Sequence, residues 1–291
     1  MYDIIIGNPP YQAHSNNKGS NNILWDKFLI KAHDMLTDDG FLCAIHPSDW
    51  RSPSVVRKRL NSVLSNMLIL YLEIHDFQDG FKTFGANTRY DWYVAQICRN
   101  NNNDGEDVST IMFDDDIIAT VPNISALPFI PNSKYDFIMG LMAKDESQRL
   151  QIIKDCNYHT HNHNHKEVKI SKEKSNTHQY PCVYSVNKAN VPKLRWSSFK
   201  NGHFGIPKVI FGNGATGFVA DKSGEFGLTN FASGIVCSAE TQPLIIAALK
   251  SDRFEEVMRA IQTGSASINS NVLKLFRKDF WKEFEEEKCM T

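Results

Sequence analysis

The chain has 291 residues, 42% of them hydrophobic, so it can form one large globular domain or two ordinary ones. Its 32 basic and 33 acidic side chains give a net charge of −1, so any surface for a polyanion must be local. The six cysteines are scattered without a Cys-x-x-Cys pair, no signal peptide precedes them, and no apolar run could span a membrane. We therefore expect reduced thiols in a soluble cytoplasmic protein with no membrane partner.

The first predicted element is a strand, Asp3 to Ile6, whose continuous apolar run is typical of a strand covered on both faces. Gly7 and two prolines end it at once. Asn8 to Tyr11 would then lie at the carboxyl end of a strand, where open α/β sheets bind their ligands.

A helix over residues 23–36 and a second strand over 41–45 complete a strand–helix–strand unit, which predicts parallel pairing. His46 to Trp50 should lie on the same rim of the sheet as Asn8 to Tyr11. A helix over 54–64 and strands over 67–74 and 92–98 follow.

From about residue 108 the pattern changes to short strands and isolated prolines, with one helix predicted over 133–155. A His/Lys-rich insertion covers 156–175. Strands over 181–186, 208–211, 217–220 and 234–237 precede helices over 241–262 and 276–288. We predict two domains, residues 1–110 and 111–291.

The segment Asn8-Pro9-Pro10-Tyr11 carries groups that suit the chemistry of an aromatic amine. Such an amine is a poor nucleophile until hydrogen-bond acceptors hold its hydrogens, and the Asn8 side-chain oxygen and the Pro9 carbonyl can be those acceptors. Pro9 and Pro10 fix the turn and donate no N–H. Tyr11 offers a face on which a base pulled from a duplex can stack.

Three blocks of this sequence resemble the S-adenosylmethionine-dependent DNA adenine-N6 methyltransferases, particularly the gamma-class and fused restriction-modification enzymes. The blocks are Asp3-Ile-Ile-Ile-Gly-Asn-Pro-Pro-Tyr11, Leu36-Thr-Asp-Asp-Gly-Phe-Leu-Cys-Ala-Ile-His-Pro-Ser-Asp-Trp50 and Gly85-Ala-Asn-Thr-Arg-Tyr-Asp-Trp-Tyr-Val94. The resemblance implies that Asn8, Pro9, Pro10 and Tyr11 are catalytic. It also implies that an aromatic upstream of the last block, Phe84 or failing it Phe81, packs on the flipped base.

The resemblance further implies a partial, Rossmann-like α/β sheet that lacks the cofactor-binding half, followed by a mixed α+β target-recognition domain. In the family, the loops that bind S-adenosylmethionine precede the Asn-Pro-Pro-Tyr motif, so its main binding motifs are not in this chain. Val209 to Gly217 contains a lone Gly-x-Gly-x-x-Gly, but the turn-rich continuation favours recognition hairpins over a cofactor loop. The cofactor-binding residues are therefore unknown.

If the cofactor half is absent, the strand Asp3 to Ile6 should show an open hydrophobic edge. We hypothesise that a second polypeptide supplies that half; the alternative is an inactive remnant. His159, His161, His163 and His165 alternate, but their low-complexity setting favours a surface insertion over a zinc site, so we expect no metal.

Basic residues in a charge run, which could contact phosphates, and basic residues interleaved with aromatic side chains are candidates for contact with double-stranded DNA. They are Arg57, Lys58, Arg59, Arg89, Lys193, Arg195 and Lys208.

The expected function is site-specific methylation of adenine N6 in double-stranded DNA, by one part of a split or truncated enzyme. One alternative is a catalytically inactive DNA-binding specificity subunit or remnant. Another is methylation of RNA or of a protein glutamine, whose amide nitrogen is planar like that of adenine. No nuclease motif stands out.

Overall fold

The computed structural model describes residues 1–12, 23–98, 108–113, 116–122, 124–154, 170–200, 202–214, 217–263 and 268–285. The chain forms two compact units. Unit 1 comprises Met1–Met139 and Ala260–Ser265, and unit 2 comprises Gly140–Arg259 and Ala266–Thr291. None of the described helices is long and apolar enough to cross a membrane.

Unit 1 is built on a six-stranded mixed sheet with the strand order β1-β2-β4-β3-β5-β6. Its strands are β1 (Tyr2–Gly7), β2 (Leu36–Pro47), β3 (Met67–His75), β4 (Tyr90–Ile97), β5 (Val108–Phe113) and β6 (Asp116–Pro122). β1 pairs with β2 in parallel, as the strand–helix–strand pattern predicts, and β3 pairs with β5 in parallel. The remaining pairs are antiparallel, so the sheet is mixed.

The expectation that the first strand is covered on both faces is wrong. β1 is an edge strand that pairs only with β2 among the described strands. Ile5 packs against the core, whereas Ile4 and Ile6 on the other face are 61% and 76% exposed. The open hydrophobic edge expected for this strand is confirmed.

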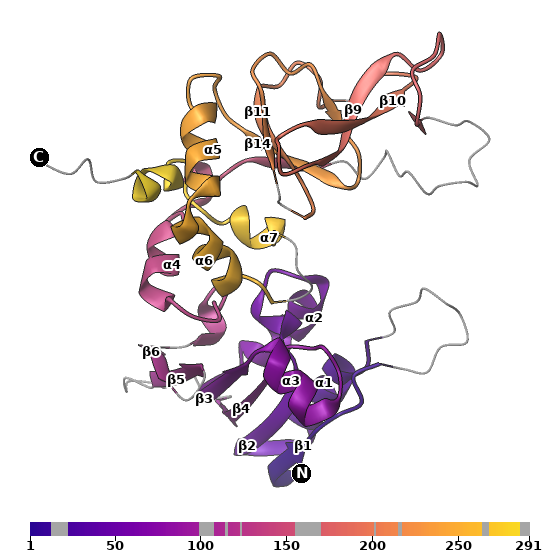
Figure 1. Ribbon diagram of the computed structural model, residues 1–291. Coiled ribbons are helices and arrows are strands. Elements are labelled where there is room, and N and C mark those ends of the chain that lie inside the picture. Colours follow the sequence, from indigo (N-terminus) through magenta and orange to yellow (C-terminus); the bar gives the residue numbers. More distant parts are fainter. Residues whose placement is uncertain are drawn as a thin grey trace, which may run out of the picture. The chain divides into compact units, whose positions relative to one another are not determined.

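Helices α1 (Trp25–Met35) and α2 (Val55–Leu64) contact strands β2 and β3, respectively (Figure 1). Every second residue of the central strands faces this core, as with Leu72 and Ile74 of β3, both fully buried. The side chains between them lie on the opposite face and are only half-buried. α2 begins at Ser54, whose hydroxyl caps the Arg57 N–H.

Helix α3 (Phe77–Phe84) joins β3 to the segment before β4. Asp76 caps its first turn by accepting from the N–H groups of Gln78 and Asp79. Gly85 ends the helix in the left-handed conformation, with φ of 64°, which favours glycine.

Unit 2 contains two four-stranded sheets, ordered β13-β9-β10-β8 and β12-β11-β14-β7. Their strands are β7 (Ile152–Lys154), β8 (Ile170–Ser171), β9 (Tyr180–Val186), β10 (Pro192–Ser197), β11 (Lys208–Gly212), β12 (Phe218–Asp221), β13 (Gly227–Leu228) and β14 (Ala232–Val236). The helices are α5 (Gln242–Lys250), α6 (Asp252–Ala260) and α7 (Ser270–Leu273), while α4 (Tyr135–Leu141) lies at the junction of the units.

Three helix predictions in this part of the chain are corrected. The helix over 133–155 ends at Leu141, because the Ala143 and Leu150 N–H groups bond to the Leu275 and Phe276 carbonyls instead of continuing the helix. The helix over 241–262 is divided at Ser251 into α5 and α6. In place of the C-terminal helix, the described residues form a 3₁₀ turn, Phe280–Phe284.

Candidate functional site

Asn8 to Tyr11 lie directly after β1, at the carboxyl end of that strand. The parallel register pairs Gly7 with Ala44, so Pro47 and the residues after it lie at the same rim, as expected. The Asn8 side chain is exposed and has no hydrogen-bond partner among the described residues. The turn is held by the Tyr11 carbonyl, which accepts from the Leu24 N–H at 3.2 Å. An amide is thus presented at the rim with its acceptor available.

The Tyr11 ring contacts Phe84, the last residue of α3. The ring centroids are 6.1 Å apart and the planes meet at 70°, an edge-to-face contact. The Tyr11 hydroxyl is buried without a partner in the described part of the chain, and burial raises its pKa. Phe81, the other candidate aromatic, is 63% exposed. Of the two phenylalanines, therefore, Phe84 is the one beside Tyr11.

Behind Phe84 lies a polar and aromatic network that the sequence reasoning missed. The Tyr90 ring packs edge-on against Phe84 at 4.9 Å and face-to-face against His75 at 4.3 Å. The Tyr90 hydroxyl donates to Asp79 at 2.6 Å. Asp79 is also paired with His75 Nδ1 at 2.6 Å, while His75 Nε2 lies 2.9 Å from Glu73. These contacts join β3, α3 and β4 directly behind the aromatic pair.

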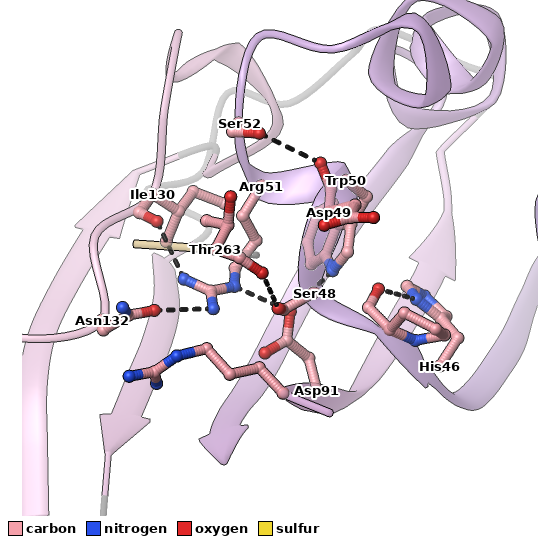
Figure 2. A network of polar contacts seen from close by, with 12 residues as sticks. His46, Ser48, Asp49, Trp50, Arg51, Ser52, Asp91, Ile130, Asn132 and Thr263 are labelled. Carbon is pink, nitrogen blue, oxygen red and sulfur yellow. Dashed lines mark hydrogen bonds and ion pairs between the residues drawn. The ribbon is translucent and has the colours of Figure 1, made fainter. Parts of the chain in front are cut away.

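The rim after β2 is held by a buried ion pair, shown in Figure 2. Arg51 Nε donates to Asp91 at 2.7 Å, and the Trp50 indole N–H donates to the same carboxylate oxygen at 2.8 Å. Arg51 and Asp91 are both fully buried. Sequence reasoning placed Trp50 at this rim and did not single out Arg51 or Asp91. An aspartate inside the apolar strand Tyr90–Ile97 was the available signal.

The same arginine fixes two distant segments of unit 1. Its other nitrogens donate to the Ile130 carbonyl at 2.9 Å and to the Asn132 side chain at 2.8 Å. Asn132 in turn donates to the Gln262 carbonyl, and Ser48 donates to the Thr263 carbonyl (Figure 2). The chain leaves unit 1 after the first of these segments and returns to it at the second. These contacts therefore hold together the two parts of unit 1, residues 130–132 and 262–263, between which unit 2 is inserted in the sequence.

His46 at this rim is not placed for acid–base chemistry. It is fully buried, stacked on Trp25 at 4.2 Å, and its Nδ1 donates to the Pro47 carbonyl at 2.9 Å. Burial lowers its pKa to about 4, so the ring is neutral near pH 7. Its role is packing.

The basic run Arg57 to Arg59 is largely used within unit 1. Arg57 is buried and donates to the carbonyls of Trp50, Ser125 and Leu127. Arg59 pairs with the buried Asp26 at 2.7 Å. Lys58 is exposed, and Arg89 stacks on the Phe77 ring at 4.8 Å. Because the Arg57 guanidinium already donates to three backbone carbonyls, we do not propose Arg57 as a DNA contact.

The candidates in unit 2 divide in the same way. Lys208 is fully buried, pairs with Asp221 at 2.6 Å, and donates to the His203 and Ile206 carbonyls. All three N–H donors of Lys208 are used inside the protein, so we do not propose Lys208 as a DNA contact. Arg195 and Lys193 on β10, in contrast, lie over the Tyr184 ring at 4.4 and 5.9 Å.

Two further cations of the same sheet region lie over aromatic rings, namely Lys174 over Trp196 and Lys200 over Tyr180. Cations interleaved with aromatic side chains suit contacts to phosphates and bases. We call Tyr184, Lys193 and Arg195, which one hairpin presents together, the cation–aromatic surface.

The described residues do not fit a methyl-donor site at the glycine-rich segment. A phosphate- or nucleotide-type Gly-x-Gly-x-x-Gly loop opens a helix at its third glycine. Here Gly217 is followed by strand β12, which pairs antiparallel with β11, so the segment is a hairpin. The described residues also contain no group of three or more His, Cys, Asp or Glu that could hold a metal ion. His159 to His165 lie outside the described residues.

Comparison with known proteins gives one family match. Residues 1–84 match the family model described as Eco57I restriction-modification methylase. No curated protein matches the sequence.

Among solved structures, the chain is similar to the Type IIL restriction-modification enzyme MmeI in complex with DNA, with 12% identity, a TM-score of 0.43, and coverage of 92% of this chain and 46% of that chain. For the type IIG restriction endonuclease BpuSI the identity is 10%, the TM-score 0.34, and the coverage 98% and 49%. For the type I methyltransferase subunit from Streptococcus thermophilus the identity is 14%, the TM-score 0.27, and the coverage 42% of this chain and 29% of that chain. The chain thus spans half or less of the length of these structures. The family match covers β1, the Asn8 to Tyr11 turn and α3 through Phe84, and so identifies this part of the chain as similar to a restriction-modification methylase.

Proposed function

We propose that this chain is the base-binding and DNA-recognising part of a site-specific DNA methyltransferase that acts on adenine N6. One observation carries the proposal: an exposed Asn8 amide, without a hydrogen-bond partner among the described residues, follows β1 three residues before Tyr11, whose ring contacts Phe84, within the segment that matches the methylase family. An amide acceptor beside an aromatic wall suits a planar base with an exocyclic amine.

In this proposal, Asn8 and Pro9 act on the reacting nitrogen. The Asn8 side-chain oxygen and the Pro9 carbonyl accept the two hydrogens of the adenine amine, which draws the nitrogen towards a tetrahedral geometry and frees its lone pair. Tyr11 stacks on the extruded base, a contact worth about 1–3 kcal/mol. The step needs no strong base before attack, which agrees with the buried, neutral state of His46 at the rim.

S-adenosylmethionine, as the family implies, would supply the methyl group. The described residues of this chain do not form a site that fits this cofactor. We propose that a further segment binds the methyl donor and completes a partial methyltransferase sheet. This segment is either a separate polypeptide or another part of a longer chain. Among the described strands β1 has a partner on one side only, and Ile4 and Ile6 are exposed; both observations support this, because proteins rarely leave a hydrophobic strand edge open.

The cation–aromatic surface of unit 2 is proposed to contact double-stranded DNA. Arg195 and Lys193 both lie over the Tyr184 ring, so two cations and a π face are presented by one hairpin. Cations bind phosphates without regard to sequence, whereas flat rings and side-chain donors can reach bases. Lys58 and Arg89 in unit 1 are proposed as further phosphate contacts.

A second candidate function is a DNA-binding specificity subunit without catalysis. The hairpin at Gly212 to Gly217 favours it, because the only glycine-rich candidate for a donor loop among the described residues is part of an antiparallel sheet. Both candidates bind DNA, and only the first transfers a methyl group.

The base-binding proposal is tested with duplex DNA that carries 2-aminopurine opposite an abasic site, where the base has no pairing partner and is extruded at lower cost. We expect tighter binding of this duplex than of the fully paired duplex, and a preference reduced at least about tenfold by Tyr11→Ala or Phe84→Ala. Phe81→Ala is the matched control, because Phe81 is on the same helix but exposed. Equal affinity for the two duplexes would refute the proposal.

A further inference from the structure

The contact between Tyr11 and Phe84 depends on residues that cannot themselves touch a base. Phe84 is the last residue of α3, a helix of only eight residues. A helix this short is only marginally stable by itself, so its position must come from tertiary contacts. The contacts at its two ends converge on one residue, Tyr90.

Tyr90 on β4 contacts α3 at three points. Its ring packs against Phe84 at 4.9 Å, and its hydroxyl donates to Asp79 at 2.6 Å and lies 3.4 Å from the Thr83 hydroxyl. Tyr90 is only 4% exposed, so these contacts are made inside the protein. Burial, followed by the bond to Asp79, raises the pKa of Tyr90 to about 12, and that bond lowers the pKa of Asp79. The hydrogen bond therefore joins a protonated phenol to an ionised carboxylate, which is a strong pair.

His75 holds the other side of the same arrangement. Its ring lies flat on Tyr90, with an interplanar angle of 2°, while its Nδ1 lies 2.6 Å from Asp79 and its Nε2 lies 2.9 Å from Glu73. His75 thus ties β3 to the first turn of α3 and fixes the Tyr90 ring from behind. Gly80 shows how closely α3 is seated, because a Cβ at this position would overlap the Thr88 carbonyl.

We propose that Tyr90 and His75 are positioning residues that hold Phe84 at the distance from Tyr11 that base binding requires. This inference rests on the proposed function, and it adds residues to it that contact neither base nor DNA. The charged and titratable groups around His75 are Glu73 on β3, Asp79 and Lys82 on α3, and Tyr90 and Asp91 on β4.

Two variants and a matched control separate positioning from general stability. Tyr90→Phe keeps both ring contacts and removes the hydroxyl bond to Asp79, whereas His75→Gln removes the stacked ring. Thr37→Val is the control, because the Thr37 hydroxyl also donates to a carboxylate, Asp3 Oδ1 at 3.1 Å, and neither residue belongs to the group formed by His75, Asp79, Tyr90 and Phe84.

The readout is the ¹⁹F resonance of 4-fluorophenylalanine placed at residue 84 of the full chain, together with binding of the 2-aminopurine duplex. We expect Tyr90→Phe and His75→Gln to shift or broaden that resonance and to weaken the preference for the extruded base about tenfold, the effect of one hydrogen bond to a charged group. Thr37→Val should change neither.

An unchanged resonance in both variants would overturn the positioning role, whatever the DNA result. A wild-type chain that shows no preference for the extruded base would instead overturn the proposed function and the role in base binding derived from it. In that case the ¹⁹F result still decides whether Tyr90 and His75 fix Phe84. The two failures are therefore distinguishable.

Discussion

Replacement of Asp91 or Arg51 should destabilise unit 1 strongly, and replacement of both should cost less than the sum. Both side chains are fully buried and pair at 2.7 Å, so Asp91→Asn leaves a buried guanidinium without its counter-charge. A change of this kind costs about 3–5 kcal/mol. Arg51→Met should cost at least as much, because it also removes the hydrogen bonds to the Ile130 carbonyl and the Asn132 side chain.

In the double variant no charge remains buried at this position, and Trp50 can still donate to the new amide. We expect its cost to be lower than the sum of the single costs by at least about 2 kcal/mol, which is a large part of the 5–15 kcal/mol typical of a whole domain. The coupling would be measured by hydrogen exchange of the β4 amides in increasing urea, since the chain forms two compact units and whole-chain probes would report on both. Additive costs, or an Asp91→Asn cost below about 1 kcal/mol, would refute the view that this pair holds the rim.

Three further outcomes are expected. Burial lowers the pKa of His46 from 6.5 to about 4, so its contribution to stability is complete above pH 6.5 and is lost as the pH falls towards 4, by about 3 kcal/mol in all. His46→Phe should therefore flatten the plot of unfolding free energy against pH between these values, and an unchanged plot would contradict this expectation. Lys208→Met should lower the melting temperature of unit 2, because it breaks the buried ion pair with Asp221. Arg195→Ala should leave the melting temperature nearly unchanged but reduce the slope of log K against log salt for DNA binding by about 1. The reverse pattern would show that Lys208 contacts DNA and Arg195 stabilises the fold. Ile6→Glu should change stability by no more than about 0.5 kcal/mol, because Ile6 is 76% exposed, yet abolish association with the donor-binding polypeptide in size-exclusion chromatography; retained association would argue against docking at β1.

The first half of unit 1 could be predicted from sequence because its signals are local. Apolar runs bounded by glycine and proline gave β1 and β2, and apolar spacing gave α1 and α2. The segment after Leu141 could not be predicted in this way. Its residues have a helical pattern, but pairing with residues 275–277 satisfies their backbone groups instead, and a pairing so distant in sequence leaves no local signal.

The candidate site was predictable only as far as its motif. Asn8 and Tyr11 were singled out by the Asn-Pro-Pro-Tyr motif, and Phe84 by its place directly before the last of the three blocks, which begins at Gly85. The residues that hold Phe84 were not, because a histidine and a tyrosine in neighbouring strands show nothing of their contact until the register is known. Charge was equally ambiguous. Lys208 and Arg195 look alike in sequence, and only the fold separates the buried ion pair from the cation over Tyr184.

The most direct test of the proposed function is transfer of radiolabelled methyl from S-adenosylmethionine to duplex DNA by the assembly that naturally contains this chain, with the labelled nucleoside identified after digestion. The control is the same assembly with Asn8→Ala, in which the amide acceptor at the end of β1 is removed. The account predicts label in N6-methyladenine that is lost in the variant. Label that persists in the variant, label on RNA or protein instead of adenine, or no label from the natural assembly would contradict it.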